Sequence, residues 1–201
     1  IKTHQIRRVA VLGSGVMGSA IACHLAQTGS EVLLLDLPSK EGPRNSPAEG
    51  ALKASMKSKP APLYSKRFVK RIECGNFDDD LSRIAECDWI IEVIVERLDI
   101  KQQLFERVEE YRKPGTLITS NTSGIPISQL SEGRSEDFQE HFCGTHFFNP
   151  PRYLQLLEII PGPKTDQRVI DFFMGYGESV LGKQSVLCKD TPAFIANRVG
   201  V

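Results

Sequence analysis

Short apolar runs alternate with stretches of helical periodicity through the first 120 residues of the chain. The apolar runs predict strands at residues 7–12, 31–35, 88–95 and 116–120. Apolar residues spaced three or four apart predict helices at residues 16–27, 48–59 and 98–112. Strands that are apolar along their whole length are typical of a parallel sheet buried on both faces. The repeated order of strand, helix and strand therefore predicts an α/β fold, a doubly wound sheet of the Rossmann type.

The pattern changes after residue 140, where two strand-like runs, 142–148 and 153–160, flank a short Pro-rich turn. A helix at 166–180 and a strand at 184–188 follow, and Thr191-Pro192 opens a helical pattern that the chain does not finish. We therefore expect an antiparallel hairpin that extends a mostly parallel sheet. Residues 1–188 would form one domain, and residues 189–201 would begin a second.

Each run of the predicted hairpin carries one ionisable residue where a core side chain is expected. Pairing about Arg152 places His146 directly opposite Glu158, within side-chain reach. A bare carboxylate in an apolar strand costs several kcal/mol, so Glu158 should have a partner. An imidazole held by that carboxylate can act as a general base near neutral pH.

The segment VAVLGSGVMG at residues 9–18 places GxGxxG directly after a strand and directly before a helix. Gly13 would allow the tight turn, Gly15 the approach of a pyrophosphate, and Gly18 close packing of helix on strand. Asp36 ends the second strand, where it would accept from both hydroxyls of an adenosine ribose. Its charge would repel a 2′-phosphate, which favours NAD over NADP. A purely structural glycine turn is the alternative, but it leaves Asp36 unexplained.

Two further polar segments follow predicted strands, and the residues alone leave each open. Ser120-Asn121-Thr122-Ser123-Gly124 could hold a nicotinamide ribose or a substrate hydroxyl, or it could be a polar turn that caps a helix at Pro126. Glu92 and Glu96 bracket a buried strand, and Lys101 lies one helical turn further on. By pattern alone, Glu96 and Lys101 are better interpreted as a strand-end acid and a surface lysine.

Charge narrows the function classes only slightly. The 25 basic residues balance the 25 acidic ones, so net charge gives no reason to expect nucleic-acid or membrane binding. Residues 51–71 are locally basic, with seven Lys or Arg and no acid. This run could be a solvated helix face, which is the commoner case, or a site for a polyphosphate handle on a substrate.

The five cysteines occur in no metal-like spacing, and several lie inside apolar runs, which predicts reduced core residues and no metal site. A reducing compartment fits this usage, so we expect a cytoplasmic protein. No run is long enough to span a bilayer, and no signal peptide is visible. The first residue is Ile and the last residues continue a helical pattern, so we expect both ends to be cut from a longer chain.

Six segments together carry a family resemblance. They are, in order, VAVLGSGVMGS, IIEVIVERLDIKQQLF, ITSNTS, GTHFFNPP, LLEII and CKDTPAFIANRVG. In these segments the chain closely resembles the NAD-binding domain of the L-3-hydroxyacyl-CoA dehydrogenases of fatty-acid β-oxidation, over residues 7–199. The family includes stand-alone enzymes and multifunctional β-oxidation proteins, and the segments do not tell these two forms apart.

The resemblance implies roles for individual residues in the oxidation of a (3S)-3-hydroxyacyl-CoA to a 3-oxoacyl-CoA by NAD. His146 matches the catalytic base, Glu158 the carboxylate that orients it, Ser123 the serine that contacts substrate and cofactor, and Asn197 the asparagine that helps to polarise the substrate carbonyls. Residues matched to cofactor binding are Gly13, Gly15, Val16, Met17, Gly18, Asp36, Glu96, Lys101, Asn121, Ser123 and Asn149. Lys57 is the best match for a contact to CoA, although a serine expected near it is missing.

The chain departs from the family after residue 188. Members carry a further helical domain that closes the cleft and mediates assembly into dimers or larger oligomers. We therefore expect this piece to bind NAD but to turn over acyl-CoA weakly. Two other functions stay open: a sister β-hydroxyacid or sugar-acid dehydrogenase, which would use a lysine at the reaction centre, and a non-catalytic NAD-binding domain.

Overall fold

The computed structural model describes residues 5–58, 66–151 and 153–190, and in them the chain forms an eight-stranded sheet with helices on both faces. The strands are β1 (Arg8–Leu12), β2 (Glu31–Asp36), β3 (Ile72–Asn76), β4 (Trp89–Glu92), β5 (Leu117–Ser120), β6 (Phe142–Phe147), β7 (Leu156–Pro161) and β8 (Gln184–Leu187). The helices are α1 (Val16–Gln27), α2 (Ser46–Met56), α3 (Leu98–Tyr111), α4 (Ile127–Leu130), α5 (Glu136–Glu140) and α6 (Gln167–Ser179), with 3₁₀ turns η1 (Lys66–Arg71) and η2 (Leu81–Glu86).

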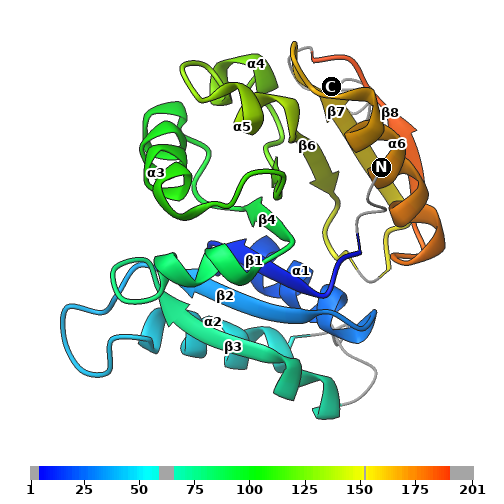
Figure 1. Ribbon diagram of the computed structural model, residues 1–201. Coiled ribbons are helices and arrows are strands. Elements are labelled where there is room, and N and C mark those ends of the chain that lie inside the picture. Colours follow the sequence, from blue (N-terminus) through cyan, green and yellow to red (C-terminus); the bar gives the residue numbers. More distant parts are fainter. Residues whose placement is uncertain (1–4, 59–65, 152, 191–201) are drawn as a thin grey trace.

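The strand order is β3-β2-β1-β4-β5-β6-β7-β8, and only the β6–β7 pair is antiparallel (Figure 1). The first six strands follow the Rossmann order, in which the winding direction reverses between β1 and β4. The predicted fold class, a mostly parallel sheet with an antiparallel hairpin, is therefore confirmed.

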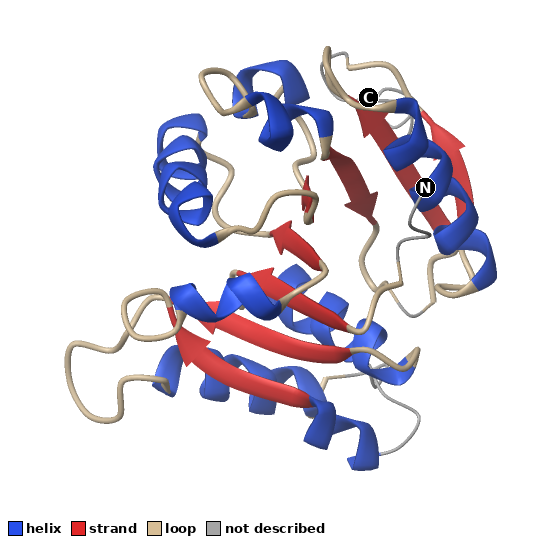
Figure 2. Ribbon diagram, viewed as in Figure 1, coloured by secondary structure: helices blue, strands red, loops and turns tan. Residues whose placement is uncertain are grey.

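Each face of the sheet carries its own apolar core, because the central strands are buried on both sides (Figure 2). One core joins the sheet to α1, α2 and α6. The other joins it to η2, α3, α4 and α5. With both faces covered, the ligand-accessible crevice is left at the carboxyl ends of the strands.

Several boundaries differ from the sequence prediction. The edge strand β3 was missed, because its ECGN residues lack an apolar alternation and it pairs only with β2 on one side. Strand β4 stops at Glu92, whose carboxylate accepts from the backbone N–H of Ile94 and so ends the ladder. Strand β7 starts at Leu156 rather than residue 153, because the N–H groups of Tyr153 and Leu154 both donate to Pro150 in a turn.

Some predicted elements cannot be compared with the structure. The last residue of the helix predicted at 48–59 and the helical start at Thr191 lie outside the described residues. The short helix α4 was considered only as the helix at Pro126, and α5 was not predicted, since each spans little more than one turn. In the part of the chain that is described, no helix combines the length and apolar character needed to cross a bilayer.

A buried line of hydrogen bonds joins β4, β5 and β6 across the sheet. The indole N–H of Trp89 donates to Thr119 Oγ1 over 2.9 Å, and the hydroxyl of Thr145 donates to the same atom over 2.7 Å. All three side chains are fully buried. Thr119 is therefore the shared acceptor on which both neighbouring strands depend.

We expect Thr119→Val to lower the free energy of unfolding by about 1–3 kcal/mol, because it leaves two buried donors without their acceptor at nearly constant volume. Urea denaturation followed by fluorescence would measure the change. Thr145→Val is the matched control, because it keeps the Trp89 bond and should cost less. Equal losses in the two variants would contradict a shared acceptor.

Candidate active site

The crevice lies where the glycine-rich turn follows β1, and two cavities flank that turn. A cavity of about 550 Å³ extends from the turn past Asp36 toward α3. A second, of about 620 Å³, lies between the start of α1, the end of α2 and the segment around Asn149. Ser14 and Gly15 line both cavities. The turn therefore separates two binding spaces and can contact the occupants of both.

The glycine turn is closely packed at two positions and open at the third. A Cβ on Gly13 would lie 2.6 Å from the carbonyl oxygen of Val93, and the residue has a φ of +114°. A Cβ on Gly18 would lie 1.9 Å from the carbonyl oxygen of Gly13. Gly15, at the N-cap of α1, has no heavy atom within 4 Å of its Cβ direction. This is the geometry that a pyrophosphate requires, with backbone N–H groups and the positive end of a helix at an open face.

Asp36 ends β2 at the rim of the first cavity, as the sequence predicts. One carboxylate oxygen accepts from the backbone N–H of Ser14, at 3.0 Å, and from the Ser14 hydroxyl. The other accepts from the N–H of Leu37 over 2.7 Å. The carboxylate is thus held against the glycine turn while remaining partly exposed. It suits an acceptor for ribose hydroxyls and would repel a phosphate at that position.

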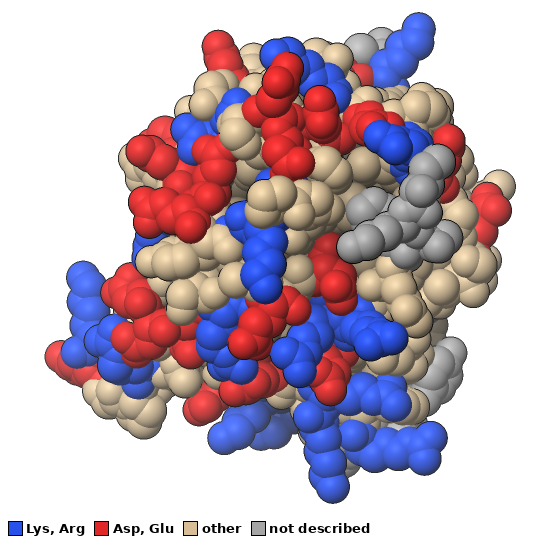
Figure 3. All heavy atoms as spheres, in the orientation of Figure 1, with Lys and Arg blue, Asp and Glu red and all other residues tan. Residues whose placement is uncertain are grey.

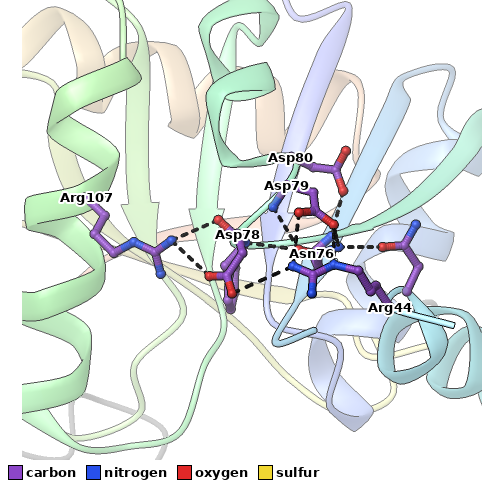
Figure 4. A network of polar contacts seen from close by, with 8 residues as sticks. Arg44, Asn76, Asp78, Asp79, Asp80 and Arg107 are labelled. Carbon is purple, nitrogen blue, oxygen red and sulfur yellow. Dashed lines mark hydrogen bonds and ion pairs between the residues drawn. The ribbon is translucent and has the colours of Figure 1, made fainter. Parts of the chain in front are cut away.

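A polar network adjoins the first cavity through Arg107, which lines that cavity (Figure 4). Its centre is the buried Asn76, whose amide oxygen accepts from the N–H groups of Asp78 and Asp79 over 3.0 and 2.8 Å. Arg44, from the loop after β2, binds both carboxylate oxygens of Asp79 at 2.6 and 3.0 Å. Arg107, from α3, lines the cavity and lies 3.4 Å from Asp78. These contacts hold the loop and the helix against the turn after β3.

The predicted His146–Glu158 pair forms across the β6–β7 ladder in the expected register. His146 Nδ1 lies 3.3 Å from Glu158 Oε1, and the two residues are 6% and 0% exposed. Burial lowers the pKa of His146 below its usual value, and the Glu158 charge and hydrogen bond offset part of that shift. The imidazole is therefore neutral at pH 7. Glu158 fixes Nδ1, so Nε2 is the nitrogen that can accept a substrate proton.

Ser123 is hydrogen-bonded to Glu96, which lies on the loop after β4. The Glu96 carboxylate accepts from the backbone N–H and the hydroxyl of Ser123, both at 3.0 Å, and from the Thr122 hydroxyl at 2.5 Å. Burial alone would raise the pKa of Glu96, but these hydrogen bonds and the nearby Lys101 ammonium hold it below its usual value. The loops after β4 and β5 are thereby joined at the crevice.

The helix-capping alternative for the Ser120–Gly124 turn is wrong. The N–H groups of Ile127 and Ser128 begin α4 and have no acceptor within the helix. They donate to the carboxylate of Asp190 at 2.6 and 2.9 Å. The turn's polar side chains instead point to Glu92 and Glu96, through Ser120 and Ser123.

The surface-lysine interpretation of Lys101 is also wrong, since its side chain is 1% exposed. Its ammonium lies 2.6 Å from Glu92 Oε2, 3.2 Å from the carbonyl oxygen of Ile94, and 3.9 Å from Glu96. Glu92 is fully buried, and its burial raises its pKa against the opposing effect of Lys101. Lys101 therefore lies beneath the crevice, behind Glu96.

The remaining predicted residues lie around the second cavity or beyond the described part of the chain. Asn121 accepts from the N–H of Phe147 at 2.8 Å, which fixes the loop after β5 beside β6. Asn149 lines the second cavity. Lys57 is exposed at the end of α2, where it lines a separate hollow with Lys53 and Met56 and not the second cavity. Asn197 lies outside the described residues.

Exposed basic side chains gather along α2 and η1. Lys and Arg cover the lower edge of the molecule in Figure 3, where α2 lies in Figure 1. The exposed residues are Lys53, Lys57, Arg67, Lys70 and Arg71. Two of them also have structural contacts, since Arg67 and Arg71 lie over the Phe68 ring. These exposed positive charges are suited to pairing with a phosphate-bearing group, but they do not enclose a binding site.

Sequence reasoning assigned no role to three residues that support the site, namely Glu92, Ser120 and Cys188. Ser120 donates to Glu92 at 2.6 Å, and Cys188 lies 3.1 Å from Glu158 Oε2. Glu92 itself was noted only as a residue bracketing a strand. Its position in a wholly apolar run was a usable signal, because such a carboxylate requires a partner. Nothing near Cys188 in the sequence indicates its contact.

Comparison with known proteins matches residues 8–191 to the family described as 3-hydroxyacyl-CoA dehydrogenase, NAD binding domain. A probable 3-hydroxyacyl-CoA dehydrogenase of Bacillus subtilis is 50% identical over 210 residues, covering 97% of this chain and 27% of that protein. One from Deinococcus radiodurans is 48% identical over 198 residues, covering 98% of this chain and 57% of that protein. The crystal structure of 3-hydroxybutyryl-CoA dehydrogenase from Escherichia coli matches with a TM-score of 0.83 at 33% identity, covering 98% of this chain and 41% of that one. The chain thus spans between a quarter and three-fifths of these relatives' lengths.

The glycine turn provides a matched pair of substitutions. Gly18→Ala should destabilise the fold by about 1–3 kcal/mol, because its Cβ would meet backbone that cannot give way. The Cβ of Gly15→Ala would enter open space, so the free energy of unfolding of this variant should differ from the wild type by less than about 1 kcal/mol. Its methyl group would nevertheless block the pyrophosphate face, and NAD binding should weaken about tenfold or more, as measured by titration calorimetry. Normal NAD affinity in Gly15→Ala would contradict this use of the turn.

Proposed function

Since the chain belongs to the 3-hydroxyacyl-CoA dehydrogenase family, as its NAD-binding domain, we propose that it provides the cofactor site and the catalytic base for the NAD-dependent oxidation of (3S)-3-hydroxyacyl-CoA to 3-oxoacyl-CoA in fatty-acid β-oxidation. The observation that carries the proposal is the buried His146–Glu158 pair beside the crevice. A neutral imidazole held at one nitrogen by a carboxylate is the arrangement of a general base.

The residues around the glycine turn fit a dinucleotide. The face of the turn at Gly15 is open, the N-terminus of α1 points to it, and Asp36 lines the first cavity beside the turn. Val16 and Met17, in the first turn of α1, add backbone N–H groups that have no partner within the helix. NAD, when bound, supplies the hydride acceptor for the oxidation.

The protein's own part in the reaction is to hold the substrate hydroxyl and take its proton. His146 Nε2 receives the proton of the 3-hydroxyl as the hydride leaves C3, and Glu158 stabilises the imidazolium that forms. Ser123 is held to Glu96 by its backbone N–H, and its hydroxyl would turn from that carboxylate to contact the substrate oxygen, as the family resemblance implies. Asn197 would assist at the substrate carbonyls, as the family resemblance implies.

The second cavity is the best candidate for the acyl-CoA. It opens between α1, α2 and the Asn149 segment, whereas the exposed Lys57, which the family resemblance matches to a CoA contact, lines a neighbouring hollow on α2. An ammonium at that position would pair with a phosphate of the CoA handle. The cavity and the base would then hold the two ends of one substrate.

A lysine-based sister dehydrogenase is the weaker alternative. Of the two lysines that sequence reasoning assigned to the site, Lys57 is exposed on α2 and Lys101 is buried. Its ammonium is occupied by Glu92 and a backbone carbonyl. A general base must reach the substrate, and a buried ion pair does not.

The role of the pair can be tested in the full-length protein by its pH–rate profile. Glu158→Gln removes the charge that raises the pKa of His146, so the acid limb of kcat/KM should move to lower pH, with a slower maximal rate. The neutral imidazole is the active form, which is why a lower pKa extends activity downward. His146→Gln should lower kcat about 10²–10⁴-fold while NAD affinity stays normal. An unmoved limb in Glu158→Gln would refute the dyad.

A second prediction concerns the expected helical domain beyond residue 188, which in this family closes the cleft and joins subunits. The 201-residue chain should bind NADH, by fluorescence, yet reduce acetoacetyl-CoA at least about 100-fold more slowly than the full-length protein, since a near-attack geometry depends on closure. Equal rates would show that the chain is catalytically complete. NADH binding without turnover by the full-length protein would favour a non-catalytic role.

A further inference from the structure

Cys188 contacts the oxygen of Glu158 that His146 does not use. Its Sγ lies 3.1 Å from Glu158 Oε2, whereas His146 Nδ1 lies 3.3 Å from Oε1. Both residues of the sulfur contact are buried, Cys188 at 3% and Glu158 at 0% exposure. The carboxylate is therefore held from both sides, by a thiol and by an imidazole.

The backbone fixes the thiol in this position. Strand β8 pairs in parallel with β7, and its ladder sets Glu158 opposite Val186. Directly after β8, the N–H of Cys188 donates to the carbonyl of Ile159 over 2.8 Å. The sulfur's alternative acceptor, the carbonyl of Val186, is more distant at 3.7 Å. The sheet itself thus directs the thiol to the carboxylate.

Only the neutral thiol fits this contact. A thiolate would place two negative charges 3.1 Å apart in a buried position, which is strongly unfavourable. A protonated thiol instead provides an S–H donor to an acceptor that is ionised, which strengthens an otherwise weak bond.

We propose that Cys188 is a positioning residue of the catalytic pair: its S–H donates to Glu158 Oε2, keeps Oε1 turned toward His146, and limits how strongly Glu158 attracts a proton onto the imidazole. This inference rests on the proposed role of His146 as base. It assigns Cys188 no contact with substrate or cofactor.

The direction of the effect follows from charge sharing. A carboxylate that also accepts from a thiol has less negative charge available for the imidazole. Removing the thiol should therefore raise the pKa of His146, whereas Glu158→Gln should lower it. Loss of a net hydrogen bond corresponds to a shift of about half a pH unit.

The test compares Cys188→Ala, Cys188→Ser and Cys143→Ala. Cys143→Ala is the matched control, because it removes an equally buried thiol from β6 whose side chain belongs to the core on the α1 face. The titration of the His146 ring, followed by NMR on the 201-residue chain, reports the coupling without substrate. The acid limb of kcat/KM in the full-length protein reports its catalytic consequence.

Cys188→Ala should raise the His146 midpoint by about half a unit and move the acid limb equally, while Cys188→Ser should recover at least half of the shift, because its hydroxyl can still donate. Cys143→Ala should titrate like the wild type.

The proposal is overturned if Cys188→Ala titrates like the wild type, or if Cys143→Ala shifts as much. If Cys188→Ala does not fold, Cys188→Val, which also lacks a donor, takes its place: a raised His146 midpoint supports the proposal, and an unshifted midpoint overturns it. A full-length protein without dehydrogenase activity would refute the proposed function, and the NMR titration would still decide the Cys188 contact.

Discussion

Two glutamates, Glu92 in β4 and Glu158 in β7, are completely buried, and the compensation of their charge determines how the crevice is built. A carboxylate removed from water costs several kcal/mol unless donors replace its hydration. Glu92 is paired with Lys101 at 2.6 Å, and Glu158 faces His146 at 3.3 Å. Glu92 is therefore compensated by a lysine ammonium. Glu158 instead faces an imidazole whose pKa is lowered by burial.

The ion pair of Glu92 and Lys101 is connected to Ser123 through Glu96. Lys101 lies 3.9 Å from Glu96, and Glu96 accepts from both the backbone and the hydroxyl of Ser123. The buried charge in β4 is thus linked by successive contacts to the loop after β5. Partners that orient a reacting group are common features of catalytic sites, because a loosely held group loses the geometry that the reaction needs.

The cofactor side of the crevice depends on close backbone packing rather than on charge. Gly13 and Gly18 bring the turn against β4 and α1, and Asp36 holds the turn through Ser14. The Asn76 network adjoins the same cavity through Arg107. Backbone packing and hydrogen bonds thus hold the turn, Asp36 and the residues after β3 in place along this cavity.

Much of the architecture could be predicted from local pattern. The alternating elements, the glycine turn with Asp36, and the His146–Glu158 register all follow from residues that are neighbours in sequence or in one hairpin, where periodicity is a direct record of geometry. Edge strand β3 could not be predicted, because its pattern is weak and its place is set by pairing with β2. The family resemblance brought Glu96 and Ser123 into the site, and the structure then gave them a mutual contact.

By itself, the amino-acid sequence determined the order of the elements, the glycine turn and the facing of a histidine and a glutamate. Only the tertiary structure decided which charged side chains are buried and which groups pair with them. The Ser120–Glu92 and Cys188–Glu158 contacts join residues 28 and 30 positions apart. Even Lys101, nine positions from Glu92, reads as a surface residue until the packing of α3 on the sheet is known. The cost of burying a charge depends on every element that excludes water from it, and no local pattern records that sum.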